Sequence, residues 1–194
     1  MGGGKTSPLD FLPETPYTLV MERIHYIIGI IIFLIFTVAS VADDWIPRKE
    51  EIVAITLLGE ARGEGERGMY AVACVIQKRT EERNLLPIEV CQQYRTVKGR
   101  KVWQFSTWAD KKYVDTMERL IKANTKEAKY AKYLARQLTQ RVPRKFQQGF
   151  TGHANHFYSH KIMRKPPFWA KGFKPTKVIG NHTFYKLPWA SNNK

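Results

Sequence analysis

The sequence predicts an α+β domain that is mainly helical, carries a small antiparallel β-sheet and is preceded by an N-terminal signal or anchor helix. Apolar residues recur at helical spacing between residues 49 and 140. In the last third, short segments of β-type pattern flank a Gly180-Asn181 turn, which is typical of a hairpin. Helices followed by paired strands indicate an α+β architecture. A chain of 194 residues and 22.5 kDa allows one such domain with an appendage.

The N-terminal part has the layout of a secretory signal. Residues 26–42 contain no charged side chain, and Arg23 precedes them. Ser40 and Ala42 are small residues at alternate positions before Asp43, so a signal peptide cleaved after Ala42 is expected. The alternative is an uncleaved membrane anchor, for which the run is somewhat shorter than the about 20 apolar residues that a bilayer needs. N-terminal sequencing of the exported protein distinguishes the two.

The chain is therefore divided into residues 1–42, an extension with a signal peptide or membrane anchor, and residues 43–194, an exported domain. Translation from Met21 would give a signal of ordinary length. The domain is expected in the periplasm, the cell wall or the extracellular space, and residues 24–42 are the segment through which it could associate with a membrane.

The chain is strongly basic, with a formal net charge of +15 and a pI near 9.9. Such a charge predicts an anionic partner, and export favours a cell-wall polymer over nucleic acid, which is not expected as a partner. Export also permits a disulfide, for which Cys74 and Cys91 are the two available cysteines. On its apolar helical run, however, Cys74 is expected to be a small buried residue.

Two helical runs flank a glycine-rich segment. The first helix is expected over Lys49–Ala61 and should be mostly buried, because its apolar stripe is wide. Four glycines between residues 59 and 68 are expected to break the helical period. The second helix is expected from about Met69 to Arg83, with Gln77 and Lys78 directed outward.

The middle of the chain is mixed. A short turn or helix is expected over residues 87–94, and residues 98–108 lead from a basic turn into an extended aromatic–polar segment. Two further helices are expected over residues 113–121 and 125–140, with Asn124 or Thr125 as the cap between them. The lysines and arginines of the second of these should form a solvated face.

The last third is expected to form the sheet. After a basic loop over residues 143–152, a strand is predicted over residues 153–160 and a tight hairpin over residues 178–185. An irregular aromatic bridge at residues 166–170 connects them.

Glu60 is the candidate catalytic residue. It lies near the C-terminal end of the first helix, where the macrodipole places partial negative charge, and it follows Leu57 and Leu58. These surroundings disfavour the ionised carboxylate and should raise the pKa of Glu60. A carboxylic acid that stays protonated near neutral pH is what general-acid catalysis requires. A surface glutamate at a frayed helix end is the alternative interpretation.

Aromatic residues next to amide and hydroxyl groups indicate a sugar-binding segment. Trp103 and Trp108 offer flat faces beside Gln104 and Ser106, whereas Phe105 is expected to be core. A zinc site is a minor alternative, because residues 153, 156 and 160 do not share one face of a strand.

Four segments occur in order along the exported domain: Gly59-Glu60-Ala61-Arg62-Gly63-Glu64, Gln104-Phe105-Ser106-x-Trp108, Thr151-Gly152-x-Ala154-x-His156-Phe157 and Ile179-Gly180-Asn181-His182-x-Phe184-Tyr185. Together they resemble the SleB/CwlJ family of cell wall hydrolases, known from spore-cortex lytic enzymes. The resemblance covers roughly residues 52–186. One such motif would be weak, but four in sequence order are specific.

The resemblance implies a lysozyme-like fold and an enzyme that cleaves the peptidoglycan glycan strand at N-acetylmuramic acid, without a metal or cofactor. It places the family's single catalytic glutamate at Glu60. Family members behave as lytic transglycosylases, which close an anhydromuramic end instead of adding water. The residues expected to bind the substrate are Glu64, Gln104, Ser106, Trp108, His156, Tyr158, Trp169, Asn181, His182 and Tyr185.

Three departures from the family pattern bear on substrate preference more than on catalysis. Thr107 stands where relatives often have cysteine, so that site cannot form a disulfide with Cys91. Residues 122–149 are longer and more basic than the resemblance predicts, and His153 takes a place usually held by glycine.

Two other functions remain open from the sequence. A muramidase would use two carboxylates, Glu60 with Glu64 or Glu66, as a conventional glycoside hydrolase. A non-enzymatic, basic cell-wall-binding protein would explain the charge but would leave Glu60 without a role.

Overall fold

The structure is a computed structural model, and it describes residues 49–188. The expected signal or anchor and the boundary after residue 42 lie outside this range. Within it, a helix covers residues 49–61, and four labelled helices follow: α2 (Gly65–Arg83), α3 (Pro87–Cys91), α4 (Lys111–Lys122) and α5 (Lys126–Thr139). In this part of the chain, no helix is both long and apolar enough to span a bilayer.

Two small sheets complete the domain. Strands β1 (Tyr94–Val97) and β2 (Arg100–Trp103) form an antiparallel hairpin in which Tyr94 pairs with Trp103. Strands β3 (His156–Ser159), β4 (Lys177–Ile179) and β5 (His182–Tyr185) form an antiparallel sheet in the order β3-β5-β4. The predicted α+β class, the mainly helical content and the hairpin on Gly180-Asn181 are thereby confirmed.

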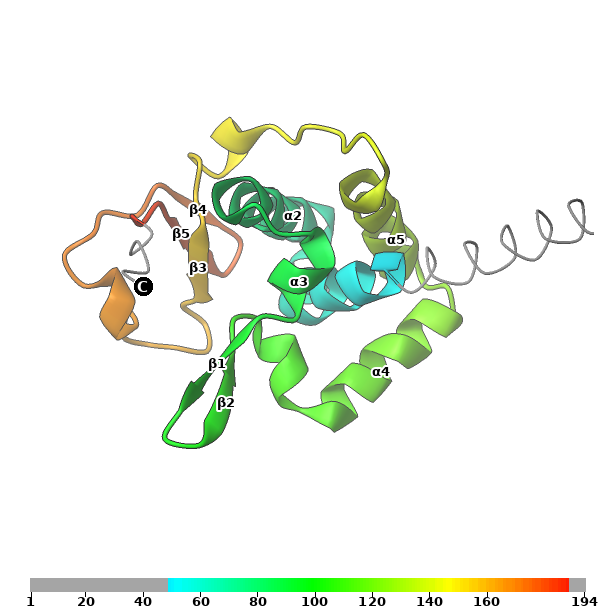
Figure 1. Cartoon of the computed structure of the whole chain (residues 1–194), viewed down its shortest axis with the longest axis horizontal. Helices are drawn as coiled ribbons and strands as arrows, with labels where there is room; N and C mark the ends of the chain where they lie inside the picture. The colour runs from blue at the N-terminus through cyan, green and yellow to red at the C-terminus, as the bar shows by residue number, and fades with distance from the viewer. Residues whose placement is uncertain (1–48, 189–194) are drawn as a thin grey trace, which may run out of the picture. The chain divides into compact units, whose positions relative to one another are not determined.

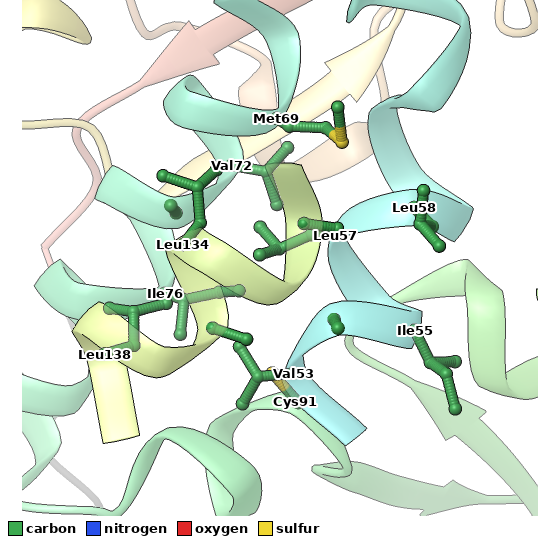
Figure 2. Close-up of a cluster of buried hydrophobic side chains, with 14 of the residues drawn as sticks. Val53, Ile55, Leu57, Leu58, Met69, Val72, Ile76, Cys91, Leu134 and Leu138 are labelled. Carbon is green, nitrogen blue, oxygen red and sulfur yellow. The ribbon is translucent and has the colours of Figure 1, made fainter. Parts of the chain in front are cut away.

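The helix over residues 49–61 lies in the core. Val53, Leu57 and Leu58 are fully buried in the main core, and Figure 2 shows Leu57 next to Val72 of α2 and Leu134 of α5. Full burial of a leucine or valine side chain is worth about 1.5–3 kcal/mol. The end of this helix, which carries Glu60, is therefore held in place by the main core.

Helix α2 is the central element of the described domain. It packs against α5 on one side and contacts β4 of the three-stranded sheet on the other (Figure 1). Burial raises the pKa of the Cys74 thiol on this helix to about 12. Cys74 is buried, as expected, and both it and Cys91 are free thiols.

The predicted start of α2 was wrong. The helix begins at Gly65, four residues before Met69, and only a 3₁₀ turn, η1 (Arg62–Glu64), separates it from the preceding helix. Gly68 lies inside α2 at a position where a larger residue would collide with Glu64. A Cβ at Gly68 would lie only 2.4 Å from Cβ of Glu64. The expected break is therefore confirmed at Gly65, whose φ of 66° ends η1, whereas Gly68 allows close packing inside α2.

The outward orientation expected for Gln77 was also wrong. Its side chain is only 6% exposed. The physical reason is a partner from a distant segment, because Oε1 of Gln77 accepts the backbone N–H of Phe146 at 2.8 Å. A buried amide is tolerated when its hydrogen bonds are made.

The middle segment differs from the prediction in two places. Tyr94, expected to end a short turn or helix, begins β1, and the residues after β2, expected to be extended, form a 3₁₀ helix, η2 (Ser106–Ala109). Helices α4 and α5 match the prediction within two residues at each end. Thr125 caps α5 by accepting the N–H of Ala128, as expected.

Candidate active site

A pocket of about 990 Å³ opens where the first helix, η2 and the three-stranded sheet meet. This volume is at the upper end of the usual range for ligand sites, so the pocket has room for more than one sugar ring. Its wall comes from residues 59, 60, 62–64 and 79, several residues between 103 and 113, several between 157 and 169, and residues 181 and 182.

Glu60 is held in this pocket by one of its two carboxylate oxygens. Oε1 accepts the backbone N–H of Thr107 at 2.8 Å and the Thr107 hydroxyl at 2.8 Å. The hydroxyl of Ser106 donates to the same oxygen at 3.0 Å. Within residues 49–188, no group donates to Oε2. Oε1 therefore serves as an acceptor only, and Oε2 is the oxygen that can carry and transfer a proton.

The local sequence explains how η2 reaches the carboxylate. A Cβ at Gly59 would lie 2.2 Å from the Thr107 hydroxyl oxygen, so only glycine lets η2 approach this closely. The Tyr113 hydroxyl donates to the carbonyl of Gly59 at 2.7 Å, which satisfies one of the carbonyls left unpaired at a helix end. The indole N–H of Trp108 donates to the Thr56 hydroxyl at 3.0 Å.

Glu64 connects η1 to the three-stranded sheet. Its Oε2 accepts the backbone N–H of Asn181 at 2.7 Å and lies 3.3 Å from Nδ1 of His182. Both side chains of this pair are less than one-tenth exposed. Gly180, with φ of 56°, leaves the space for this contact, because a Cβ there would overlap the carboxylate of Glu64.

Aromatic side chains form part of the pocket lining. Trp103, Tyr158 and Trp169 belong to it, and the rings of Tyr158 and Trp169 contact each other in an aromatic wall. Tyr185 supports this wall from behind, with its ring 5.6 Å from that of Trp169 and 6.1 Å from that of Tyr158. Flat aromatic faces in the same pocket as a carboxylate are a suitable arrangement for sugar rings.

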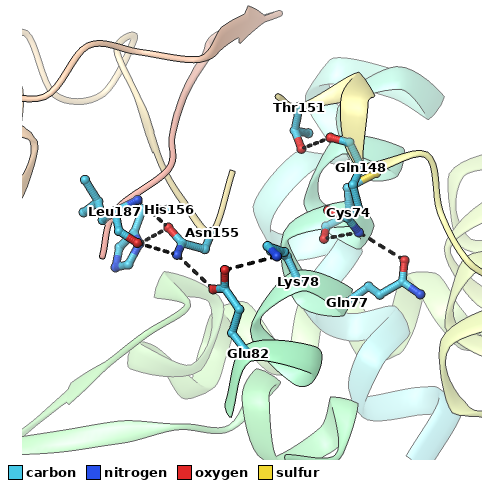
Figure 3. A network of polar contacts seen from close by, with 9 residues as sticks. All are labelled: Cys74, Gln77, Lys78, Glu82, Gln148, Thr151, Asn155, His156 and Leu187. Carbon is cyan, nitrogen blue, oxygen red and sulfur yellow. Dashed lines mark hydrogen bonds and ion pairs between the residues drawn. The ribbon is translucent and has the colours of Figure 1, made fainter. Parts of the chain in front are cut away.

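Asn155 fixes the start of β3 to the segment after β5. Its amide donates to Glu82 Oε2 at 2.9 Å and to the carbonyl of Leu187 at 2.8 Å. Its Oδ1 accepts the N–H of Leu187 at 2.9 Å and lies 2.8 Å from Nδ1 of His156 (Figure 3). The amide thus uses both its donors and its acceptor to hold the sheet against α2.

His156 makes the stability of this region depend on pH. Burial, and after it the positive charges of Arg79 and Arg83, lower the pKa of His156 from 6.5 to about 4, against an opposing effect of Glu82. Between these pH values the unfolded chain binds a proton that the folded protein does not, so stability falls as the pH drops through that window.

We expect the parent protein to lose about 1 kcal/mol more stability than His156→Gln between pH 7 and pH 5, after allowing for solvent screening at a partly exposed ring. Urea unfolding of both proteins at the two pH values measures this. Equal losses in the two proteins would contradict the role of His156.

The structure brings most of the sequence-predicted site residues together, but not all. Trp108 packs against the main core, and His156 and Tyr185 lie behind the aromatic wall. The predicted residues that line the pocket are Glu60, Glu64, Gln104, Ser106, Tyr158, Trp169, Asn181 and His182.

Arg79 lines the pocket and was not expected from the sequence. It is 3% exposed, its Nε donates to the carbonyl of Asn155 at 2.7 Å, and its guanidinium lies 4.8 Å from the Phe105 ring. Burial lowers the pKa of Arg79 to about 10, so it remains a cation at neutral pH. A signal was present in the sequence, because Arg79 follows Val72 by seven residues and Val75 by four, on the apolar face of the helix.

A family model described as Cell Wall Hydrolase matches residues 63–185, more than half of the chain. The chain belongs to the cell wall hydrolase family. The resemblance to SleB/CwlJ-type hydrolases is thereby confirmed. Glu60 lies three residues before the matched range, and the pocket that it occupies is built almost entirely from residues within that range. No curated protein and no solved structure matches the chain significantly.

Membership of the cell wall hydrolase family makes this chain an enzyme of peptidoglycan degradation. The large pocket, its aromatic lining and the Glu60 carboxylate held through one oxygen are suited to a large polar substrate.

Proposed function

We propose that this cell wall hydrolase cleaves the glycan strand at N-acetylmuramic acid as a lytic transglycosylase, with Glu60 as both acid and base. The observation that supports this is the hydrogen bonding of Glu60. Three donors converge on Oε1, and Oε2 has no donor among residues 49–188. This arrangement suits a carboxyl group that gives up a proton from one fixed oxygen and later takes one back there.

In the first step, Glu60 donates its proton to the glycosidic oxygen as the bond from that oxygen to the anomeric carbon breaks. In the second step, a hydroxyl of the same muramic acid residue attacks the anomeric carbon, and the Glu60 carboxylate accepts the hydroxyl proton. The glutamic acid is restored, and no water is consumed. The three donors on Oε1 stabilise the carboxylate that exists between the two steps.

The other carboxylates of the pocket wall have structural partners. Glu64 accepts the N–H of Asn181, and Asp110 caps α4 by accepting the N–H of Lys112. Glu66 is exposed and does not line the pocket. These contacts favour a reaction with one catalytic carboxylate over the two-carboxylate muramidase.

The products distinguish the two reactions. Digestion of purified peptidoglycan in heavy-oxygen water, followed by mass spectrometry, should give anhydro ends one water lighter than hydrolysis products and without the heavy isotope. A muramidase digest run in parallel supplies the hydrolysis standard. Heavy oxygen at the new reducing ends would overturn the transglycosylase proposal and point to a second carboxylate.

A further inference from the structure

A second cavity of about 230 Å³ lies between α2, α5 and residues 144–147, and it shares no lining residue with the catalytic pocket. We call it the α5 cavity. It is smaller than most sites for drug-sized ligands, so it suits one ring or a short side chain. The residues of interest in its lining are Tyr70, Tyr130, Tyr133, Arg144, Lys145 and Gln147.

The basic wall of the α5 cavity is fixed to α2 by buried amides. Gln77 accepts the N–H of Phe146 at 2.8 Å and donates to the carbonyl of Arg144 at 3.2 Å. Gln148 donates to Gln77 at 3.1 Å and to the carbonyl of Cys74 at 3.2 Å (Figure 3). The backbone that carries the cations is therefore pre-organised, which lowers the entropy cost of binding a ligand.

Tyrosine rings form the other side of the cavity. The rings of Tyr130 and Tyr133 stack with centroids 6.1 Å apart, and Tyr133 is 47% exposed. Nη1 of Arg144 donates to the Tyr133 hydroxyl at 3.1 Å, and the hydroxyl of Tyr70 accepts the N–H of Gln147. Partial burial, and then the charge of Glu66, raises the pKa of Tyr130, so its phenol stays a neutral donor.

The positive charge of the segment that closes the cavity favours an anion, against the opposing charge of Glu66 near Tyr130. No aspartate or glutamate follows Glu127 in the sequence, and Arg141, Arg144 and Lys145 are all exposed on the segment that closes the cavity. A flat aromatic ring beside a guanidinium and an ammonium group recognises a ring that carries a carboxylate or a phosphate. The segment belongs to residues 122–149, the stretch that is longer and more basic than the family resemblance predicts.

We propose that the α5 cavity binds one anionic unit of the cell wall, with a ring on Tyr133 and a carboxylate or phosphate at Arg144 and Lys145. The proposal rests on the assignment of peptidoglycan as the substrate. It gives the enzyme a second contact with the polymer, separate from the catalytic pocket. Two contacts on one polymer increase retention through effective concentration, without any change in the chemistry at Glu60.

The test measures binding to purified insoluble wall by co-sedimentation, with every variant carrying Glu60→Gln so that the wall stays intact. Tyr133→Ala and Arg144→Ala should each weaken binding about tenfold. Lys129→Ala removes the same charge from an exposed position of α5 outside the cavity, and it should change binding less than twofold. Equal binding of the Arg144 and Lys129 variants would overturn the proposal.

Two further comparisons identify the anion and separate loss of the site from misfolding of a variant. Removing phosphate-containing polymers from the wall abolishes the difference between Arg144→Ala and Lys129→Ala if the ligand is a phosphate, and preserves it if the ligand is a carboxylate. Arg144→Lys keeps the charge and should bind more tightly than Arg144→Ala. If Arg144→Lys binds no better than Arg144→Ala, and Tyr133→Ala binds as well as the parent, the site is not used. The readout is independent of product chemistry, so failure of the transglycosylase proposal would be seen separately.

Discussion

Replacing Glu60 with glutamine is expected to reduce wall-lytic activity at least about 10⁴-fold, at the upper end of what general acid–base catalysis provides, because one group serves both steps. The substitution should not disturb the fold. A glutamine amide oxygen can accept the same hydrogen bonds from Ser106 and Thr107 that Oε1 now accepts. Its amide nitrogen, however, has no proton that it can give to a leaving oxygen. Turbidity loss of purified wall measures the activity, and thermal unfolding measures the fold.

Two neighbouring carboxylates serve as controls for this substitution. Glu66→Gln changes an exposed residue that does not line the pocket, so its effect should be small. Glu64→Gln keeps an oxygen for the N–H of Asn181, and it should reduce activity less than Glu60→Gln. Full activity of Glu60→Gln, or a greater loss for Glu64→Gln, would remove Glu60 from its catalytic role.

Gly59→Ala is expected to damage both stability and activity although it adds only one methyl group. The new Cβ would lie 2.2–2.8 Å from three side-chain atoms of Thr107, a residue that is fully buried. Relief of this overlap requires η2 to move away from the helix end, at a cost of about 1–3 kcal/mol in the free energy of unfolding. The same movement displaces the two Thr107 donors from Glu60, and a misplacement of about 1 Å can cost 10²-fold in rate.

The matched control is Gly63→Ala, because a Cβ at Gly63 meets no atom within 4 Å. Its free energy of unfolding should stay within about 0.5 kcal/mol of the parent value. Adding Thr107→Gly to Gly59→Ala removes the overlapping atoms, so the double variant should lose less stability than the two single variants summed, while activity stays low because the hydroxyl donor is lost. Urea unfolding and the wall assay give the two readouts. If Gly59→Ala is as stable as Gly63→Ala, the close approach of η2 is not needed.

The sequence was informative where periodicity and turn chemistry act locally. The wide apolar stripe before Glu60 predicted a buried helix, and Gly180-Asn181 predicted the hairpin between β4 and β5. The position of Glu60 at the end of the first helix followed from the same stripe. These features depend on neighbouring residues, which is why a single sequence reveals them.

What the sequence did not reveal depends on partners far along the chain. Gln77 and Arg79 are polar residues on α2 that are buried because residues 144–148 and Asn155 supply their hydrogen-bond partners. Asn155 itself is fully buried and bonded to Leu187, 32 positions away. Periodicity directed Gln77 outward and placed Arg79 on the apolar face, but it contains no information on which distant segment will satisfy a buried polar group. Gly59 and Gly68 misled for a related reason, because each allows a close approach that depends on the neighbouring backbone and side chains.

The contact between Glu64 and Asn181 has a mechanical consequence. Glu64 follows Glu60 by four residues, and its buried carboxylate holds the β4–β5 turn that carries one side of the pocket. The separation between the reacting oxygen and that side is therefore set by one short piece of backbone rather than by a long flexible loop. We expect an opening held in this way to respond to the tension of the strand that enters it. Slack and stretched regions of the same wall should therefore be cut at different rates, which a comparison of relaxed and stretched wall measures.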